Sequence, residues 1–151
     1  MSNLNFFITT FICICLNYFL LSTNLWFFSP DVFLLNVLFL ASTYTTYPKV
    51  YFFILNGFFI DIFFYEIVGP YTITYFIIGI FLTFSLVRWV QRSLLIQFAL
   101  IAVISLLLNA LIGALEGFAF VQNRAAMSTI LLGIIWVLIF LYQRDKWLKN
   151  I

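Results

Sequence analysis

Apolar residues run along this chain in long blocks, broken only by short polar stretches. About 20 apolar residues cross a bilayer as a helix, with a range of about 17–25. Six blocks approach or reach that length, some of them short. The spans that we expect are residues 5–22, 31–46, 49–68, 70–90, 94–115 and 125–142.

The blocks are too long and too uniformly apolar for strands of a β-barrel. In lipid the backbone polar groups must find partners inside the protein, so only α-helices and closed barrels cross a membrane. Barrel strands alternate between apolar and polar residues over about 10 positions. The sequence therefore predicts an all-α integral membrane protein, with residues 1–151 forming a single six-helix transmembrane bundle.

Composition supports this class and limits the chemistry. The chain is 66% hydrophobic and 8% charged, whereas a soluble domain has about 25% charged residues. Histidine, the commonest metal ligand, is absent. Cys13 and Cys15 lie two apart, so on a helix they do not face each other; we interpret them as packing residues, with a disulfide or metal site as the lesser alternative. We expect no catalytic group, no cofactor, no metal and, at a net charge of +2, no nucleic-acid partner.

Lysine and arginine indicate the orientation. With six spans, one side of the membrane holds both termini together with Lys49, Arg88, Arg92, Arg144, Lys146 and Lys149. The other side holds Arg124 together with Asp31, Glu66 and Glu116. The positive-inside rule then places both termini in the cytoplasm. Trp26, Trp89 and Trp147 fall near span ends, where aromatic side chains tend to anchor a protein at the interface.

Asp61 interrupts the third apolar block and is the leading candidate for a functional residue. A carboxylate in a membrane-spanning segment costs about 2.5–3.5 kcal/mol on insertion scales, so it usually faces other helices or a water-filled cavity. Asp61 is eight residues before Gly69, about 12 Å along a helix.

Asparagines on three other spans fall at a similar depth, so we expect a buried polar pocket formed by Asp61, Asn36, Asn109, Asn17 and, one turn after Asp61, Tyr65. Inside such a pocket an asparagine could hydrogen-bond the Asp61 side chain, which we expect as the neutral acid because burial disfavours charge. The alternative is that each asparagine makes its own interhelical bond.

The fifth block carries a row of small and polar residues at every fourth position: Ser105, Asn109, Gly113 and Gly117. Small residues allow two helix backbones to approach closely in a membrane. This seam predicts either packing within the bundle or a contact for a helix of another protein.

Two short motifs resemble those of the rod shape-determining protein MreD family. Ser29-Pro30-Asp31, followed by two leucines, resembles the entry to an early helix of that family. The stretch from Gly57 to Asp61, with Gly69 after it, resembles the family's core motif of a glycine and an aspartate four residues apart. The resemblance covers nearly the whole chain, but residues 66–70 replace the glycine-rich turn that the family often has.

The resemblance implies a non-enzymatic component of the bacterial inner membrane that helps maintain rod shape and direct lateral peptidoglycan synthesis. The implied partners are an MreC-like single-span protein, RodA, its transpeptidase partner, MreB and membrane lipid. It also implies a bundle resembling the substrate-binding subunits of energy-coupling-factor transporters, and such a vitamin-transporter subunit is the alternative function. Those subunits are expected to have small residues on their first helix, whereas here the seam is on the fifth, which favours the scaffold.

Overall fold

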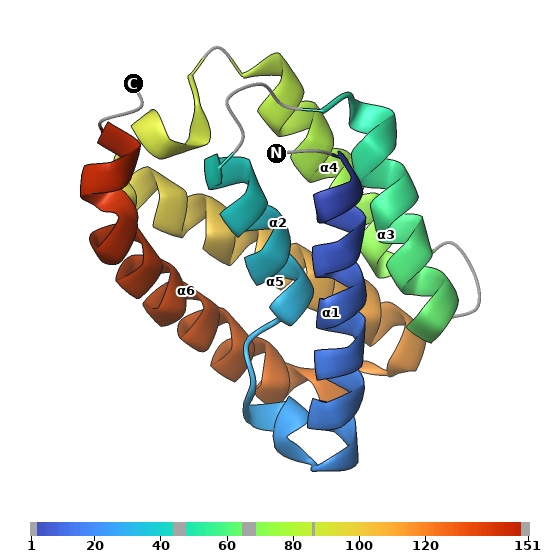
Figure 1. Ribbon diagram of the computed structural model, residues 1–151. Coiled ribbons are helices and arrows are strands. Elements are labelled where there is room, and N and C mark those ends of the chain that lie inside the picture. The colour runs from blue at the N-terminus through green and yellow to red at the C-terminus, as the bar shows by residue number, and fades with distance from the viewer. Residues whose placement is uncertain (1–2, 44–47, 65–68, 86, 149–151) are drawn as a thin grey trace.

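The computed structural model describes residues 3–43, 48–64, 69–85 and 87–148, which form helices and connecting segments without a strand (Figure 1). Within these ranges there are six α-helices and two 3-10 helices. They are α1 (Asn3–Ser22), η1 (Leu25–Phe28), α2 (Val32–Thr43), α3 (Val50–Phe64), α4 (Pro70–Phe84), η2 (Trp89–Gln91), α5 (Leu94–Glu116) and α6 (Phe118–Leu148). The prediction of an all-helical protein is confirmed for the described residues.

The helices fall into a long and a short class. Three of them contain windows long and apolar enough to cross a membrane: Asn5–Ser22 in α1, Leu94–Leu115 in α5 and Arg124–Tyr142 in α6. The other three, α2, α3 and α4, have 12, 15 and 15 residues. At about 1.5 Å per residue, even 15 residues reach only about 22 Å, less than the roughly 30 Å hydrocarbon core. Among the described residues, full spanning length is thus found in three of the six expected spans.

The expected helix over 70–90 is wrong at its C-terminal end. It begins at Pro70 as expected, but α4 ends at Phe84 and Ser85 is extended. Backbone groups beyond this point find other partners, because the Gln97 side chain donates to the carbonyls of Trp89 and Arg92, both at 3.1 Å. The expected ends of the second and third spans, residues 44–46 and 65–68, lie outside the described residues.

The connection between α5 and α6 is much shorter than expected. The sequence predicted a loop from 116 to 124, but α6 begins at Phe118, so only Gly117 separates the two helices. Gly117 has φ +102°, a left-handed conformation that favours glycine, and its N–H donates to the Gly113 carbonyl at 2.9 Å. The chain thus reverses at one glycine, and α6 continues past the expected end to Leu148.

The helices pack mainly as two pairs. Helix α3 lies against α4 and α5 lies against α6, while α1 contacts α2 and α3 and η1 reaches α6. In Figure 1 the start of α1 and the end of α6 lie at the same end of the molecule.

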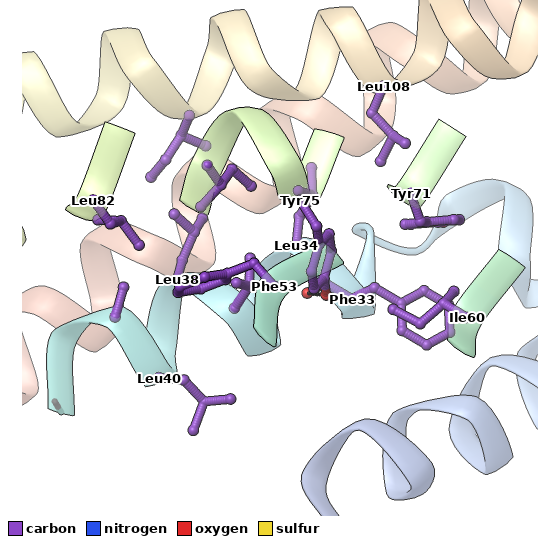
Figure 2. Close-up of a cluster of buried hydrophobic side chains, with 14 of the residues drawn as sticks. Phe33, Leu34, Leu38, Leu40, Phe53, Ile60, Tyr71, Tyr75, Leu82 and Leu108 are labelled. Carbon is purple, nitrogen blue, oxygen red and sulfur yellow. Dashed lines mark hydrogen bonds between the residues drawn. The ribbon is translucent and has the colours of Figure 1, made fainter. Parts of the chain in front are cut away.

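The core between the pairs is rich in aromatic side chains. Figure 2 shows Phe33 of α2, Phe53 of α3 and Tyr75 of α4 converging there. Trp89, which the sequence placed at the membrane interface, is instead 1% exposed and lies edge-on to Trp136, with ring centroids 5.8 Å apart. Trp89 thus packs inside the protein, and its side chain does not face the lipid.

Candidate functional site

Asp61 joins α3 to the first turn of α4. The side chain is fully buried, and its Oδ2 accepts hydrogen bonds from Gly69 N at 3.0 Å and Thr72 N at 2.7 Å. Oδ2 also accepts from the Thr72 hydroxyl at 2.6 Å, and Oδ1 accepts from Tyr71 N at 3.1 Å. One carboxylate therefore caps the N-terminus of a neighbouring helix with four bonds.

The first turn of α4 has no acceptor of its own. The first N–H groups of any helix lack intrahelical partners. Pro70 has no N–H, and Gly69 at the N-cap supplies no side-chain hydrogen bond. The N–H groups of Tyr71 and Thr72 must therefore bond to another element, and the partial positive charge of a helix N-terminus favours a carboxylate there.

These contacts correct one expectation about Asp61. The depth of about 12 Å below Gly69 assumed a straight helix up to that residue, whereas Gly69 N is in hydrogen-bond contact with the carboxylate. All four bonds join the carboxyl oxygens to N–H or O–H groups at the start of α4. The neutral acid expected from the sequence stays a prediction.

Two glycines make room for this contact. A Cβ atom added at Gly57 would lie 2.7 Å from the Tyr71 carbonyl oxygen and 2.8 Å from Thr72 Cα, both backbone atoms. A Cβ atom added at Gly69 would lie 3.1 Å from the Asp61 carboxyl carbon. The close approach of α3 to the start of α4 thus depends on residues without side chains.

Asp31 caps a second short helix. Its Oδ1 accepts from Leu34 N at 2.9 Å, three residues on, as an N-cap side chain does. Its Oδ2 accepts from the Tyr71 hydroxyl at 2.8 Å, and the residue is 4% exposed. Pro30, which we expected at the helix start, lies just before this cap, so α2 begins at Val32.

Tyr71 links the two capped ends. Its N–H donates to Asp61 and its hydroxyl to Asp31, while its ring lies 5.1 Å from that of Phe33. Four of the five residues expected from the family resemblance therefore meet around Tyr71 and Thr72: Asp31, Gly57, Asp61 and Gly69. Sequence reasoning missed Tyr71 and Thr72, although their position after Gly-Pro at a helix start marks unpaired N–H groups.

The asparagines expected around Asp61 have other partners. Asn36 Nδ2 donates to Thr10 Oγ1 at 3.2 Å, which ties α2 to α1. Asn17 is buried on α1, and Tyr65 lies outside the described residues. The described hydrogen bonds of Asp61 run to the start of α4, so the contact at Asn36 matches the alternative of separate interhelical bonds.

The seam on α5 faces α6 at its polar members. Asn109 Nδ2 donates to Ser105 O at 2.8 Å and to Ser128 Oγ at 3.4 Å. Ser105 Oγ lies 2.8 Å from Thr129 Oγ1. Gly113 is buried, whereas Gly117 ends α5 with no atom within 4 Å of an added Cβ. Ser105 and Asn109 thus serve packing within the bundle.

Asn56 and Thr74 are buried polar residues that these networks leave out. Asn56, on α3, is 0% exposed, and neither its Nδ2 nor its Oδ1 has a hydrogen-bond partner among the described residues. Thr74 Oγ1, on α4, also has no hydrogen-bond partner among the described residues. Unpaired buried polar atoms are uncommon and are the usual places for a bound water or a polar ligand group.

No other constellation in the described ranges suggests chemistry. Cys13 and Cys15 are free thiols, and no group of three or more histidine, cysteine, aspartate or glutamate residues there could hold a metal ion. Comparison of the chain with protein-family models, with curated proteins and with solved structures finds no match.

Proposed function

We propose that the chain is a non-enzymatic membrane scaffold of the bacterial cell-elongation machinery, similar to MreD. In this role it binds an MreC-like single-span protein and, with it, RodA, its transpeptidase partner and MreB. The supporting observation is that the residues of the family-like motif, Gly57, Asp61 and Gly69, fix α3 to α4.

The hydrogen bonds of Asp61 explain why this favours a scaffold. The side chain is fully buried, and its oxygens accept four bonds from the chain itself, three at Oδ2 and one at Oδ1. A side chain used in this way stabilises the contact between two helices. A bundle fixed in this way presents a rigid helix surface. Helices of other proteins can pack against such a surface through close contacts.

The location that we propose is the bacterial inner membrane, with both termini cytoplasmic. Six of the seven lysines and arginines fall on the side assigned to the cytoplasm. The start of α1 and the end of α6 also lie at one end of the molecule (Figure 1). A fluorescent protein fused to the C-terminus should fluoresce and a phosphatase fused there should be inactive; the reverse result would contradict this orientation.

Depletion and co-purification test the scaffold role. Loss of the protein from a rod-shaped cell should produce round cells, and a tagged copy in gentle detergent should recover an MreC-like single-span protein. Asp61→Leu should lose that partner together with its fold, whereas the matched control Ile62→Leu, at a 48% exposed position on the same helix, should keep it. Rods that keep their shape after depletion, with no such partner recovered, would contradict the proposal.

A second candidate is the substrate-binding subunit of an energy-coupling-factor vitamin transporter, whose fold the proposed bundle would resemble. The unpaired amide of Asn56 and hydroxyl of Thr74 favour it, because a bound ligand could satisfy both. This candidate predicts that the purified protein carries a vitamin-sized molecule at stoichiometric amounts and that Asn56→Leu loses it. It also predicts co-purification of an ATPase module and a growth defect that one added vitamin cures.

A further inference from the structure

Arg124 is a buried cation that has no counter-charge among the residues that the structure describes. The sequence placed it in a loop, but it lies on α6, is 2% exposed, and its guanidinium carbon lies 3.5 Å from the centroid of the Trp26 ring in η1. Neither Nε nor Nη1 has a hydrogen-bond partner among the described residues. The ring face attracts the cation but offers no acceptor for its N–H groups.

The carboxylates at Asp31 and Asp61 do not supply the missing acceptor. Both oxygens of each already accept bonds from the first turns of α2 and α4. A buried charge is unfavourable unless it is paired and hydrogen-bonded. The acceptor for Arg124 is therefore expected to lie outside the residues that the structure describes.

The position of Arg124 indicates what that acceptor is. Arg124 is the first residue of the apolar window of α6, and Trp26 lies four residues after the end of the α1 window at Ser22. Both residues thus lie at the boundary of the apolar layer, where lipid headgroups are found. In the same short helix, Leu25 and Phe28 are 51% and 61% exposed, which suits contact with lipid chains.

We propose that Arg124, held against Trp26, binds a phosphate group supplied by an anionic phospholipid. The planar guanidinium matches phosphate oxygens with several donors at once. Nε and Nη1 are covered in the structure, so binding requires a shift of the Trp26 ring or of η1. The site does not depend on the scaffold role and would serve any function of the bundle.

Lipid titration of the purified full chain tests this site. Phosphatidylglycerol should bind, as measured by native mass spectrometry, and raise the melting temperature, whereas diacylglycerol, which lacks the phosphate, should do neither. Arg124→Gln should weaken phosphatidylglycerol binding about tenfold, the loss expected when a charged hydrogen-bond partner is removed. Lipid binding should also change the fluorescence of the wild type, and Trp26→Phe should reduce that change.

Arg92 provides the matched control. It also stacks on an aromatic ring, with its guanidinium carbon 4.6 Å from the Phe81 centroid, and its Nε likewise has no partner among the described residues. It differs from Arg124 in that the residue is only half-buried and its Nη2 donates to Ser85 Oγ. Arg92→Gln should leave the affinity for phosphatidylglycerol unchanged. Arg124→Lys keeps the positive charge, so it covers the case in which Arg124→Gln does not fold, and it should bind the lipid more weakly than the wild type.

Three results would overturn the assignment. One is an affinity for phosphatidylglycerol that neither Arg124 variant lowers. Another is equal stabilisation by inorganic phosphate, which would make the ligand a free anion. The third is an Arg124 variant that keeps its lipid affinity but loses a co-purifying acidic membrane protein, which would identify the counter-charge as a carboxylate of a partner.

Discussion

Helices α3 and α4 are joined through a buried carboxylate, whereas α5 and α6 are joined through neutral side chains. In the first pair Asp61 accepts four hydrogen bonds at the start of α4. In the second pair the polar contacts between described residues are a pair of hydroxyls, Ser105 and Thr129, and the amide of Asn109 with Ser128. The pairs differ in length as well, since α3 and α4 have 15 residues each and α5 and α6 have 23 and 31.

Helix length explains the difference between the two pairs. A helix long enough to cross the apolar layer can leave its terminal N–H and C=O groups near water and headgroups. The start of α5 accordingly has only Ser93, an exposed serine that accepts from Ile96 N at 3.4 Å. A short helix begins inside the apolar layer, where unpaired backbone groups are costly. We infer that the buried carboxylates at Asp31 and Asp61 are a consequence of the short helices.

Removal of the Asp61 carboxylate should have the largest effect. Asp61→Leu leaves three N–H groups and one hydroxyl without an acceptor, and each unsatisfied donor costs about 1–3 kcal/mol. Asp61→Asn should be nearly as harmful, because its amide N–H₂ would face donors. Both variants should lose most of the folded protein, measured by thermal unfolding in detergent against the control Ile62→Leu. An Asp61→Asn variant as stable as the wild type would support the neutral acid expected from sequence.

The sequence was sufficient to predict most of the helices. Apolar runs predicted 5–22 and 94–115, and the structure has Asn3–Ser22 and Leu94–Glu116. The errors lie at two helix ends. Helix α4 ends at Phe84 although the apolar run continues, and α6 begins at Phe118, before the expected span. Hydropathy indicates whether a residue favours an apolar environment. It does not indicate where a helix ends, because that depends on local partners such as Gln97, which bonds the carbonyls of Trp89 and Arg92.

The site was predictable only in part. The cost of a carboxylate in an apolar block identified Asp61 as a special residue, and that reasoning needs no knowledge of the fold. Its partners could not be derived, because they depend on where the chain after α3 brings Gly69 and Thr72. A depth argument based on straight helices instead selected Asn36 and Asn109, which bond to other helices.

Gly57→Ala should have the next largest effect, because the new Cβ atom would overlap backbone atoms of α4. Overpacking of a tight contact typically costs about 1–3 kcal/mol. Gly79→Ala is the matched control within the same pair: its Cβ would meet Phe53 Cβ at 3.0 Å, a looser contact than the 2.7 Å to a backbone oxygen at Gly57. Melting temperatures in detergent should therefore fall more for Gly57→Ala than for Gly79→Ala. Equal losses would show that the close approach at Gly57 has no special role.

Tyr71→Phe should have a moderate effect confined to the link between the two caps. It removes the hydroxyl bond to Asp31 but keeps the N–H bond to Asp61 and the ring packing on Phe33. A hydrogen bond to a charged group contributes about 1.5–3 kcal/mol. A double-mutant cycle of Tyr71→Phe with Asp31→Asn, measured by unfolding, should give a coupling energy of at least about 0.5 kcal/mol. Strictly additive losses would mean that the two caps act independently.

Ser105→Ala should have the smallest effect, because it tests the neutral contact between the long helices. The change removes one hydroxyl bond to Thr129, and interhelical hydrogen bonds in membranes average about 0.6 kcal/mol. The packing of α5 on α6 remains, since Ile112 and Trp136 are both fully buried. The melting temperature of Ser105→Ala should therefore stay above that of Tyr71→Phe. A larger loss at Ser105 than at Tyr71 would show that the long pair also depends on its polar contacts, and the contrast between the two pairs would then fail.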